Sequence, residues 1–276
     1  MKTQEVPALS TKGQPSQRTC ALTRVEVLAV ILGVCVLVAV LWPARVRTGP
    51  SKEFVCLNNL HQLLIAWVSY AEDNNDNLVQ NIARDIGGGH YATTANQAGS
   101  QPGQPYACWV LGDASQPDPG FITNGLIYPY VGNCRLYKCP ADVKKNSVNQ
   151  PTLRSYSMNG WMNGNPAWTS NCVDFKKLSG ISNSLSPGMA LVFVEENPAT
   201  INDGYWVQNP NSPTTWIDSP AHFHINGGAM SFVDGHAQFR KWTDRNVLSN
   251  SSVGFASDPT SGDLAWVQAR STVKAQ

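Results

Sequence analysis

A long apolar segment near the N-terminus constrains this chain more than any other feature. From Val27 to Trp42 the sequence reads VLAVILGVCVLVAVLW, sixteen residues without a charged or strongly polar side chain. With residues 25–26 included, the stretch would rise roughly 27 Å as a helix, close to the thickness of a bilayer core. A cleaved secretory signal would be shorter and would end in a small-x-small site, and a buried helix that is apolar all round needs a large protein around it. We therefore expect a transmembrane helix.

Polar, unpatterned residues precede this segment. Glu26 stands at the start of the apolar run, where a carboxylate is costly and needs a reason. The stretch ALTRVEVLAVIL, residues 21–32, resembles the bacterial type IV prepilin signal for cleavage and methylation. The resemblance implies that 1–21 is a leader removed by a prepilin peptidase, that Ala21 precedes the cut and that Leu22 becomes the methylated N-terminus. It also implies that Glu26 pairs with the new ammonium of a neighbouring subunit.

A second helix is expected after a break at Thr48-Gly49-Pro50. Between Ser51 and Asp73, apolar residues recur at steps of three and four, which is the period of an amphipathic helix that buries one stripe. We expect a sheet to cover that stripe, and we treat 22–78 as a helical stalk, kinked near Pro50. The polar cluster 73–77 (DNNDN) ends the helix, and its oxygen atoms could also bind calcium, but EF-hand spacing is missing and a solvated turn is favoured.

The rest of the chain predicts a β-rich head over 79–245 and a polar C-terminal tail over 246–276, with a short helix around 264–267. Asp234-Gly235 separates two apolar runs and predicts a hairpin turn. No βαβ alternation is present, so the fold class that we expect is α+β, with the second helix packed on an antiparallel sheet. Short apolar runs that could supply strands are 107–111, 125–131, 190–194, 204–207, 229–233 and 236–242.

Several ordered motifs resemble a subgroup of prepilin-like proteins related to the type II secretion pseudopilin G. They comprise the run after Cys56 (CLNNLHQLLIAWVSYAEDNNDNL), the segment around Cys139 (RLYKCPAD), the segment 155–160 (SYSMNG), and His224 followed by nine residues and then Asp234-Gly235. Together with the N-terminal signal, these motifs imply a pilin-like fold.

Metal and disulfide chemistry remain open at this point. The seven cysteines contain no C-x2-C pair, so the usual zinc signatures are absent. The cysteines after the apolar segment could form a disulfide or be buried as free thiols. His224, Asp234 and His236 are weak metal candidates, against the alternative that His224 hydrogen-bonds Asp234 across the hairpin. We expect no cofactor, with calcium or another metal as the alternative.

No recognisable catalytic pattern is present, and we expect no enzyme activity. The adjacent Glu195 and Glu196 point to opposite faces of a strand and make a poor acid–base couple. With 14% charged residues and a net charge of +1, the chain lacks the basic face of a nucleic-acid binder. Aromatic residues could stack on a polysaccharide, although core packing is the default explanation for them, at Trp161, Trp168, Tyr205, Trp206 and Trp216.

The expected function is that of a pilin-like or pseudopilin subunit in a type II secretion or type IV pilus-like assembly. Its partners would be other pilin-like subunits, the membrane, and a polysaccharide or secreted substrate bound by the head. We expect a single-pass protein of the bacterial inner membrane, with a cytoplasmic N-terminus and a periplasmic or extracellular head. An unprocessed membrane-tethered binding protein is the alternative, favoured by Ala21 and Arg24, which depart from the usual signal. A metal-dependent surface enzyme is a distant third.

Overall fold

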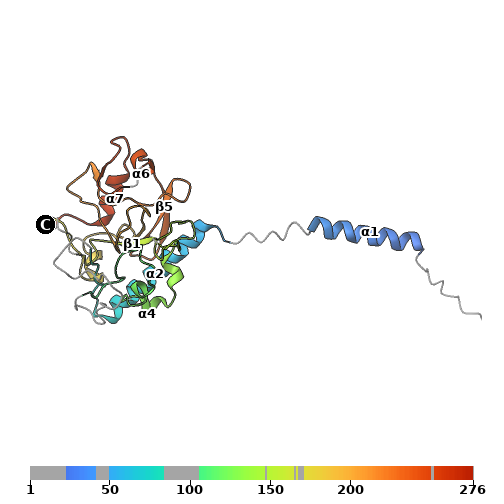
Figure 1. Cartoon of the computed structure of the whole chain (residues 1–276), viewed down its shortest axis with the longest axis horizontal. Helices are drawn as coiled ribbons and strands as arrows, with labels where there is room; N and C mark the ends of the chain where they lie inside the picture. The colour runs from blue at the N-terminus through green and yellow to red at the C-terminus, as the bar shows by residue number, and fades with distance from the viewer. Residues whose placement is uncertain are drawn as a thin grey trace, which may run out of the picture. The chain divides into compact units, whose positions relative to one another are not determined.

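The chain divides into two compact units, one ending at Gly49 and the other beginning at Pro50. The computed structural model describes residues 23–41, 50–83, 106–146, 148–164, 166, 171–249 and 252–275. Figure 1 draws both units with their helices and strands. The leader 1–21 and the expected N-terminal residue Leu22 lie outside the described residues, as does Trp168.

The described part of the first unit is a single helix, α1 (Arg24–Leu41), 18 residues long. Arg24 and Glu26 belong to its first turn, so its uncharged part, 27–41, rises only about 22 Å, against the roughly 30 Å of a bilayer core. Among the described residues, no helix has both the length and the apolar character needed to cross a membrane. The predicted transmembrane helix is therefore wrong, and so is the location derived from it, a single-pass protein of the bacterial inner membrane with a cytoplasmic N-terminus.

The second helix forms where its periodicity predicts it. α2 (Lys52–Asp73) starts directly after Ser51, whose hydroxyl caps the helix by accepting the backbone N–H of Phe54 at 3.1 Å. Its buried stripe consists of Cys56, Asn59, Leu60, Leu63, Leu64, Ala66, Trp67, Tyr70 and Ala71. This stripe packs on β2, β5 and β6, so α2 belongs to the same compact unit as the sheet.

The central sheet has the strand order β3-β1-β2-β5-β6. Its strands are β1 (Tyr156–Asn159), β2 (Leu191–Glu195), β3 (Tyr205–Trp206), β5 (Gly227–Phe232) and β6 (Ala237–Lys241). The β1–β2, β2–β5 and β5–β6 pairs are antiparallel, but β1 and β3 run parallel. The fold is thus α+β as predicted, but the sheet is mixed and not purely antiparallel. The reason is that the 45 residues between β1 and β3 return the chain to the same end of β1.

Apolar residues are buried on both faces of this sheet. One cluster joins the α2 stripe to residues such as Val192, Phe193 and Ala229. The other cluster lies on the opposite face of the same strands and includes Met230 and Phe232. Residues from the C-terminal half complete it, namely Trp216, Trp242, Val247, Phe255, Leu264 and Val267. Two buried faces explain why β2 and β5 are buried at every position.

Short helices and a second small sheet complete the unit. The helices are α3 (Gly120–Thr123), α4 (Tyr128–Val131), the 3-10 helix η3 (Cys134–Tyr137), α5 (Leu178–Ser182), α6 (Arg245–Ser249) and α7 (Asp263–Ser271). β4 (Thr215–Trp216) pairs with β7 (Phe255–Ala256). The short helix predicted around 264–267 is present as α7. Residues of the predicted tail, 246–276, thus cover the second face of the sheet, where α6 and α7 are drawn in Figure 1.

Candidate functional site

The N-terminus of α1 forms a reciprocal capping box. Thr23 directly precedes the helix, and its hydroxyl accepts the backbone N–H of Glu26 at 3.3 Å. The Glu26 carboxylate accepts the backbone N–H of Thr23 at 2.8 Å and its hydroxyl at 3.0 Å. These hydrogen bonds hold the pKa of Glu26 below its usual value. Glu26 therefore has a local role, because it satisfies backbone donors that a helix end leaves free.

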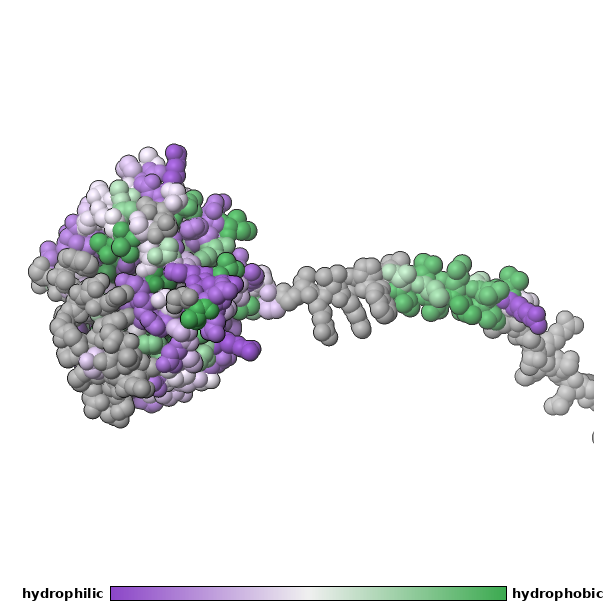
Figure 2. Space-filling view, viewed as in Figure 1, coloured by the Kyte–Doolittle hydropathy of each residue, from purple (hydrophilic) through white to green (hydrophobic). Residues whose placement is uncertain are grey.

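Beyond this cap, α1 exposes apolar side chains on all its sides. Ten large apolar residues between 25 and 38 are exposed, with fractions from 44% for Val27 to 75% for Val25. Figure 2 shows α1 as a continuous hydrophobic surface that is hydrophilic only at one end. Cys35 is also exposed on this helix. A helix that is apolar all round is stable in a folded protein only when other apolar surfaces cover it.

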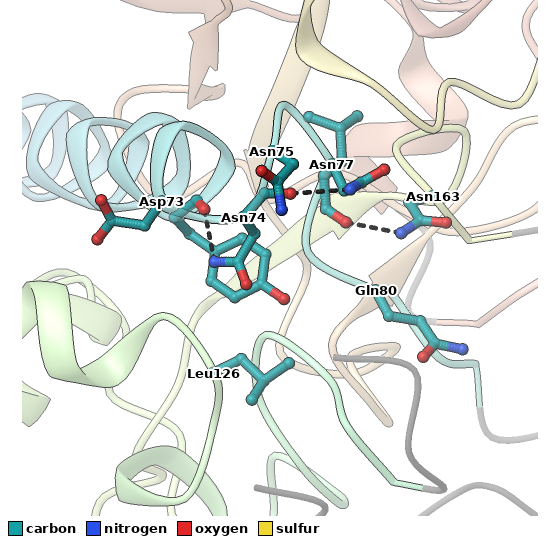
Figure 3. A pocket seen from close by; sticks show the side chains of 9 residues that line it. Asp73, Asn74, Asn75, Asn77, Gln80, Leu126 and Asn163 are labelled. Atoms are coloured by element: carbon teal, nitrogen blue, oxygen red, sulfur yellow. Dashed lines mark hydrogen bonds between the residues drawn. The ribbon is translucent and has the colours of Figure 1, made fainter. Parts of the chain in front are cut away.

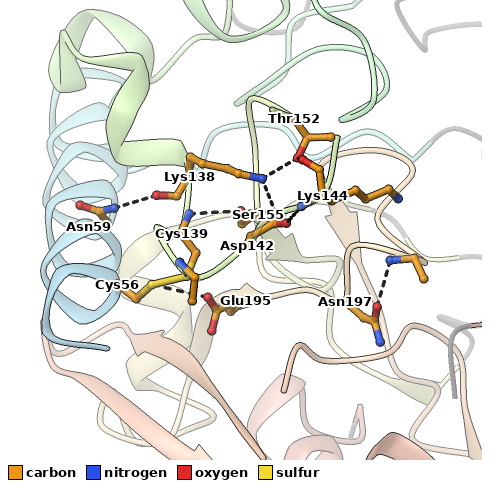
Figure 4. Close-up of polar contacts among 12 residues, drawn as sticks. Cys56, Asn59, Lys138, Cys139, Asp142, Lys144, Thr152, Ser155, Glu195 and Asn197 are labelled. Atoms are coloured by element: carbon orange, nitrogen blue, oxygen red, sulfur yellow. Dashed lines mark hydrogen bonds and ion pairs between the residues drawn. A yellow bond between two sulfur atoms is a disulfide. The ribbon is translucent and has the colours of Figure 1, made fainter. Parts of the chain in front are cut away.

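The second arrangement is a buried cluster of Cys56, Cys139, Glu195 and His224 inside the unit that begins at Pro50. Figure 4 shows the two cysteines and Glu195 of this cluster. Each residue comes from a different part of the fold. Cys56 lies on the buried stripe of α2, Cys139 follows η3, and Glu195 is the last residue of β2. His224 precedes β5 in a tight turn, where its backbone N–H donates to the carbonyl of Gly227 at 3.1 Å. Cys56 and Glu195, for example, are 139 residues apart in the sequence but lie in contact.

The four side chains lie within contact distance of one another. Cys56 and Cys139 form a disulfide, with 5.4 Å between their Cα atoms. Glu195 Oε1 lies 3.5 Å from Cys56 Sγ and 3.3 Å from His224 Nε2. His224 Nε2 also lies 3.4 Å from Cys139 Sγ. All four ligand atoms fall within 4.8 Å of one another.

The surroundings of the cluster hold these groups in place. Glu195 is fully buried, and burial raises the pKa of its carboxyl, an effect that the hydrogen bond and charge of His224 partly offset. Glu195 Oε2 accepts the backbone N–H of Ala229 at 3.1 Å. The backbone N–H of Ala141 donates to Cys139 Sγ at 3.3 Å. A carboxylate in an apolar core is costly unless it is paired, so this position requires a partner.

A polar network anchors the Cys139 loop next to the cluster. Lys138 forms an ion pair with Asp142, and Ser155 Oγ donates to the same carboxylate at 2.7 Å. The backbone N–H of Cys139 donates to Ser155 Oγ at 3.1 Å. On the other side, the side chain of Asn59 on α2 donates to the carbonyl of Lys138 at 3.1 Å. Figure 4 shows how these contacts fix the loop against α2.

The structure does not bring His224 together with Asp234 and His236. Asp234 lies in the turn between β5 and β6, where its carboxylate accepts the backbone N–H of His236 at 3.1 Å and contacts the His236 ring at 2.5 Å. Gly235 has a φ of +101°, which suits a turn glycine. The strand β5 separates this turn from His224, and six residues of strand span roughly 20 Å.

The polar turn after α2 is occupied by its own hydrogen bonds. The carboxylate of Asp76 accepts the backbone N–H and hydroxyl of Ser179, and Asp73 accepts the hydroxyl of Tyr130 at 3.0 Å. Asn77 donates its side-chain amide to the carbonyl of Asn74 at 2.8 Å. A pocket of about 500 Å³ adjoins this turn (Figure 3). The side chains proposed as calcium ligands therefore support the turn and its docking on α5.

The aromatic residues considered as a sugar-binding surface belong to the core. Trp161, Trp206 and Trp216 have no exposed surface, and Tyr205 is 4% exposed. Trp216 packs at right angles to Trp242 and its indole N–H donates to Asp244 at 2.9 Å. In this conformation these four rings serve packing and cannot stack on a ligand.

The role of Glu195 is not predictable from sequence motifs alone. Cys56, Cys139 and His224 each belong to a sequence motif, whereas the sequence places Glu195 only on a strand, on the opposite face from Glu196. The available signal was the position of a carboxylate at the end of the wholly apolar run 190–194, where a charged group needs a partner. Neither the partner nor the meeting of α2 with the Cys139 loop can be read from sequence spacing.

No protein-family model, curated protein or solved structure matches this chain. A functional assignment therefore depends on the residues themselves. Two arrangements within the described residues go beyond ordinary packing, namely the capped and exposed apolar helix α1 and the buried cluster of two cysteines, a glutamate and a histidine.

Proposed function

We propose that this chain is a pilin-like subunit that assembles with like subunits through α1, after a prepilin peptidase removes residues 1–21. The observation that carries the proposal is the helix α1, which is apolar on all sides, exposed, and acidic only in its first turn. The unit 50–276, which includes α2 and is called the head from here on, is compact by itself and would be displayed by the assembled helices.

The energetics of α1 favour a bundle of like helices. Full burial of a Val, Leu or Ile side chain stabilises by roughly 1.5–3 kcal/mol. α1 exposes ten such side chains, among them Leu28 at 65% and Leu32 at 69%. Because these residues surround the helix, one flat partner surface would leave part of them uncovered, whereas neighbouring copies of α1 can cover every side.

Glu26 would provide register in such a bundle. In the proposed assembly its carboxylate pairs with the N-terminal ammonium of Leu22 on a neighbouring subunit, so that each charge compensates the other in an apolar contact. The capping box offers a simpler role for the same residue, namely local stabilisation of the helix start. Glutamine at this position keeps a capping-box acceptor but loses the charge, and it therefore separates the two roles.

The experiment compares Glu26→Gln with Thr23→Ala in the full chain, in native cells, with thiol crosslinking at Cys35 as the readout. Cys35 is exposed on α1, and Cys134 and Cys20 are replaced by serine in all versions so that crosslinks report on α1. We expect crosslinked species in the parent chain, a several-fold loss in Glu26→Gln, and little change in Thr23→Ala.

Two results would contradict this proposal in different ways. The absence of any Cys35 crosslink in the parent chain would rule out assembly through α1. Parent-like crosslinking of Glu26→Gln, together with weaker crosslinking of Thr23→Ala, would show that Glu26 acts only as a capping residue. The N-terminal mass of each variant, measured on the same samples, controls for altered processing.

A further inference from the structure

We propose that the head contains a zinc site: when the disulfide is reduced, Cys56, Cys139, Glu195 and His224 bind one Zn²⁺, and the Cys56–Cys139 disulfide excludes the metal. This inference does not depend on assembly through α1, since all four residues belong to the unit 50–276.

The distances between the ligand atoms match a tetrahedral zinc ion. With Zn–S near 2.3 Å and Zn–N and Zn–O near 2.0–2.1 Å, the S–N, O–N and S–O pairs of a tetrahedron are about 3.6, 3.4 and 3.6 Å apart. The structure has 3.4 Å from Cys139 Sγ to His224 Nε2, 3.3 Å from Glu195 Oε1 to His224 Nε2, and 3.5 Å from Cys56 Sγ to Glu195 Oε1. The two sulfur atoms must move apart once the disulfide is reduced, because two zinc-bound thiolates lie about 3.8 Å from each other.

The donor set selects zinc over the hard cations. Two thiolates, one imidazole nitrogen and one carboxylate oxygen are ligands that zinc takes with tetrahedral geometry. Calcium and magnesium require six or more oxygen ligands or retained waters, which two sulfur atoms cannot replace. The site is closed: Cys56, Cys139 and Glu195 have no exposed surface, and His224 is 6% exposed. A closed four-ligand site is typical of structural and not of catalytic zinc.

The fold already orients the ligands as a metal site requires. The backbone N–H of Ala229 donates to Glu195 Oε2, which leaves Oε1 directed at His224 and Cys56. The backbone N–H of Ala141 donates to Cys139 Sγ, a contact that stabilises a thiolate. Zinc would also compensate the buried carboxylate of Glu195, because the ion neutralises two of the three negative charges brought by the ligands.

The same four residues can exist in two forms, one with the Cys56–Cys139 disulfide and one with bound zinc. Reduction of the disulfide by a thiol or phosphine reductant adds two electrons and two protons and yields two thiols. Zinc binding then displaces both thiol protons to solvent, because the thiolate is the ligand. Oxidation by a disulfide-containing oxidant forms the S–S bond again, removes both sulfur ligands and releases the metal.

The test uses the purified full chain in two forms, oxidised or treated with a phosphine reductant, each stripped with a chelator and dialysed against Zn²⁺ or Co²⁺. We expect one metal ion per reduced chain, with the thiolate-to-cobalt charge-transfer bands and visible bands of a tetrahedral site, and none in the oxidised chain. X-ray absorption of the zinc form should give two sulfur and two nitrogen or oxygen neighbours.

Matched variants assign the ligands. Cys56→Ser should abolish stoichiometric binding and Glu195→Gln should weaken it by at least about tenfold. Cys108→Ser, which alters another buried thiol outside the cluster, should bind like the parent. A folded, reduced parent chain that takes up no metal would overturn the proposal, as would a metal spectrum with one sulfur ligand or none. Unfolding of the parent on reduction in the presence of zinc would also overturn it, since bound metal should hold the site together.

Discussion

At the scale of single residues, the head buries more carboxylates than an apolar core readily accepts. Glu195 and Glu196 are adjacent, and both are almost completely buried. Their contacts differ: Glu195 faces Cys56 and His224, whereas Glu196 accepts the hydroxyl of Thr200 at 3.3 Å. Burial raises the pKa of Glu196, and the charge of the nearby Asp218 raises it further.

The raised pKa values of these carboxyl groups predict that the free energy of unfolding depends on pH in an unusual direction. Burial raises the pKa of Asp218 to about 7, above its ordinary value of 3.8. The folded state therefore keeps a proton that the unfolded state has lost, and stability falls as the pH rises from about 4 through 7. The slope reaches at most about 1.4 kcal/mol per pH unit for one carboxyl.

Urea unfolding at pH 5, 6, 7 and 8 measures this effect. Asp218→Asn, which keeps an acceptor for the backbone N–H of Val207, should flatten the decline. Asp76→Asn is the control, because hydrogen bonds from Ser179 lower the pKa of Asp76 and it titrates below this window. A parent protein whose stability rises from pH 5 to 8 would contradict the account.

At this scale the sequence predicted residue types better than their partners. Cys56, Cys139 and His224 were identified, but His224 was assigned to Asp234, because nine intervening residues suit a hairpin. The turn in fact begins at 233, so the whole of β5 separates the two side chains. Glu195 could not be assigned, because its partners Cys56 and His224 come from α2 and from the turn before β5.

At the scale of elements, α2 is the scaffold of the head. It begins at a capped Ser51, buries a stripe on the sheet, and is linked covalently to the segment after η3. The cap and the disulfide act in different ways, since the cap stabilises the helix end and the disulfide restricts the unfolded chain.

The cap gives a simple test. Ser51→Ala removes the acceptor for the backbone N–H of Phe54 and should lower the free energy of unfolding by about 1 kcal/mol. The exposed Ser184→Ala is the control and should change it by less than about 0.5 kcal/mol. Equal effects in chemical denaturation would show that the cap contributes nothing specific.

The disulfide makes a larger contribution. Its cysteines are 83 residues apart, and closing a loop of that length stabilises by about 4–5 kcal/mol on the chain-entropy account. Reduction in the presence of a chelator should lower the free energy of unfolding by that order, and added zinc should restore part of the loss. No change on reduction would mean that the link carries no stability.

The elements themselves were partly predictable. The 3.6-residue period of apolar residues predicted the bounds of α2 to within one residue. The two apolar runs on either side of Asp234-Gly235 predicted the β5–β6 hairpin. The runs 107–111 and 125–131 were expected to supply strands, but the first is irregular and the second contains α4. Pro129 explains the second case, because a proline suits the first turn of a helix and cannot donate in a strand ladder.

At the scale of the whole molecule, the C-terminal residues complete the head. Leu264 and Val267 of α7 enter the second core cluster, and Asn159 of β1 donates to the carbonyls of Leu191 and Ser271, both at 2.9 Å. The buried Asp263 accepts the backbone N–H groups of Thr243 at 2.6 Å and Asp244 at 2.8 Å. The polar composition of 246–276 predicted a tail, because a sequence does not distinguish buried aspartates from solvated ones.

Two truncations test this organisation. Removal of 246–276 exposes one face of the sheet and should abolish cooperative unfolding of the head. Removal of 1–49 leaves the unit that begins at Pro50 and should keep its unfolding midpoint within a few degrees. A stable head without 246–276, measured by circular dichroism, would show that α7 is dispensable.

The central claim is that α1 serves assembly in a processed, pilin-like subunit, and the mature N-terminus tests it most directly. Mass spectrometry of the N-terminal peptide from protein isolated from native cells determines it. The account predicts a chain that begins at Leu22 with a methylated amine, four residues before the capping-box residue Glu26. An N-terminus at Met1 in all of the protein would contradict it.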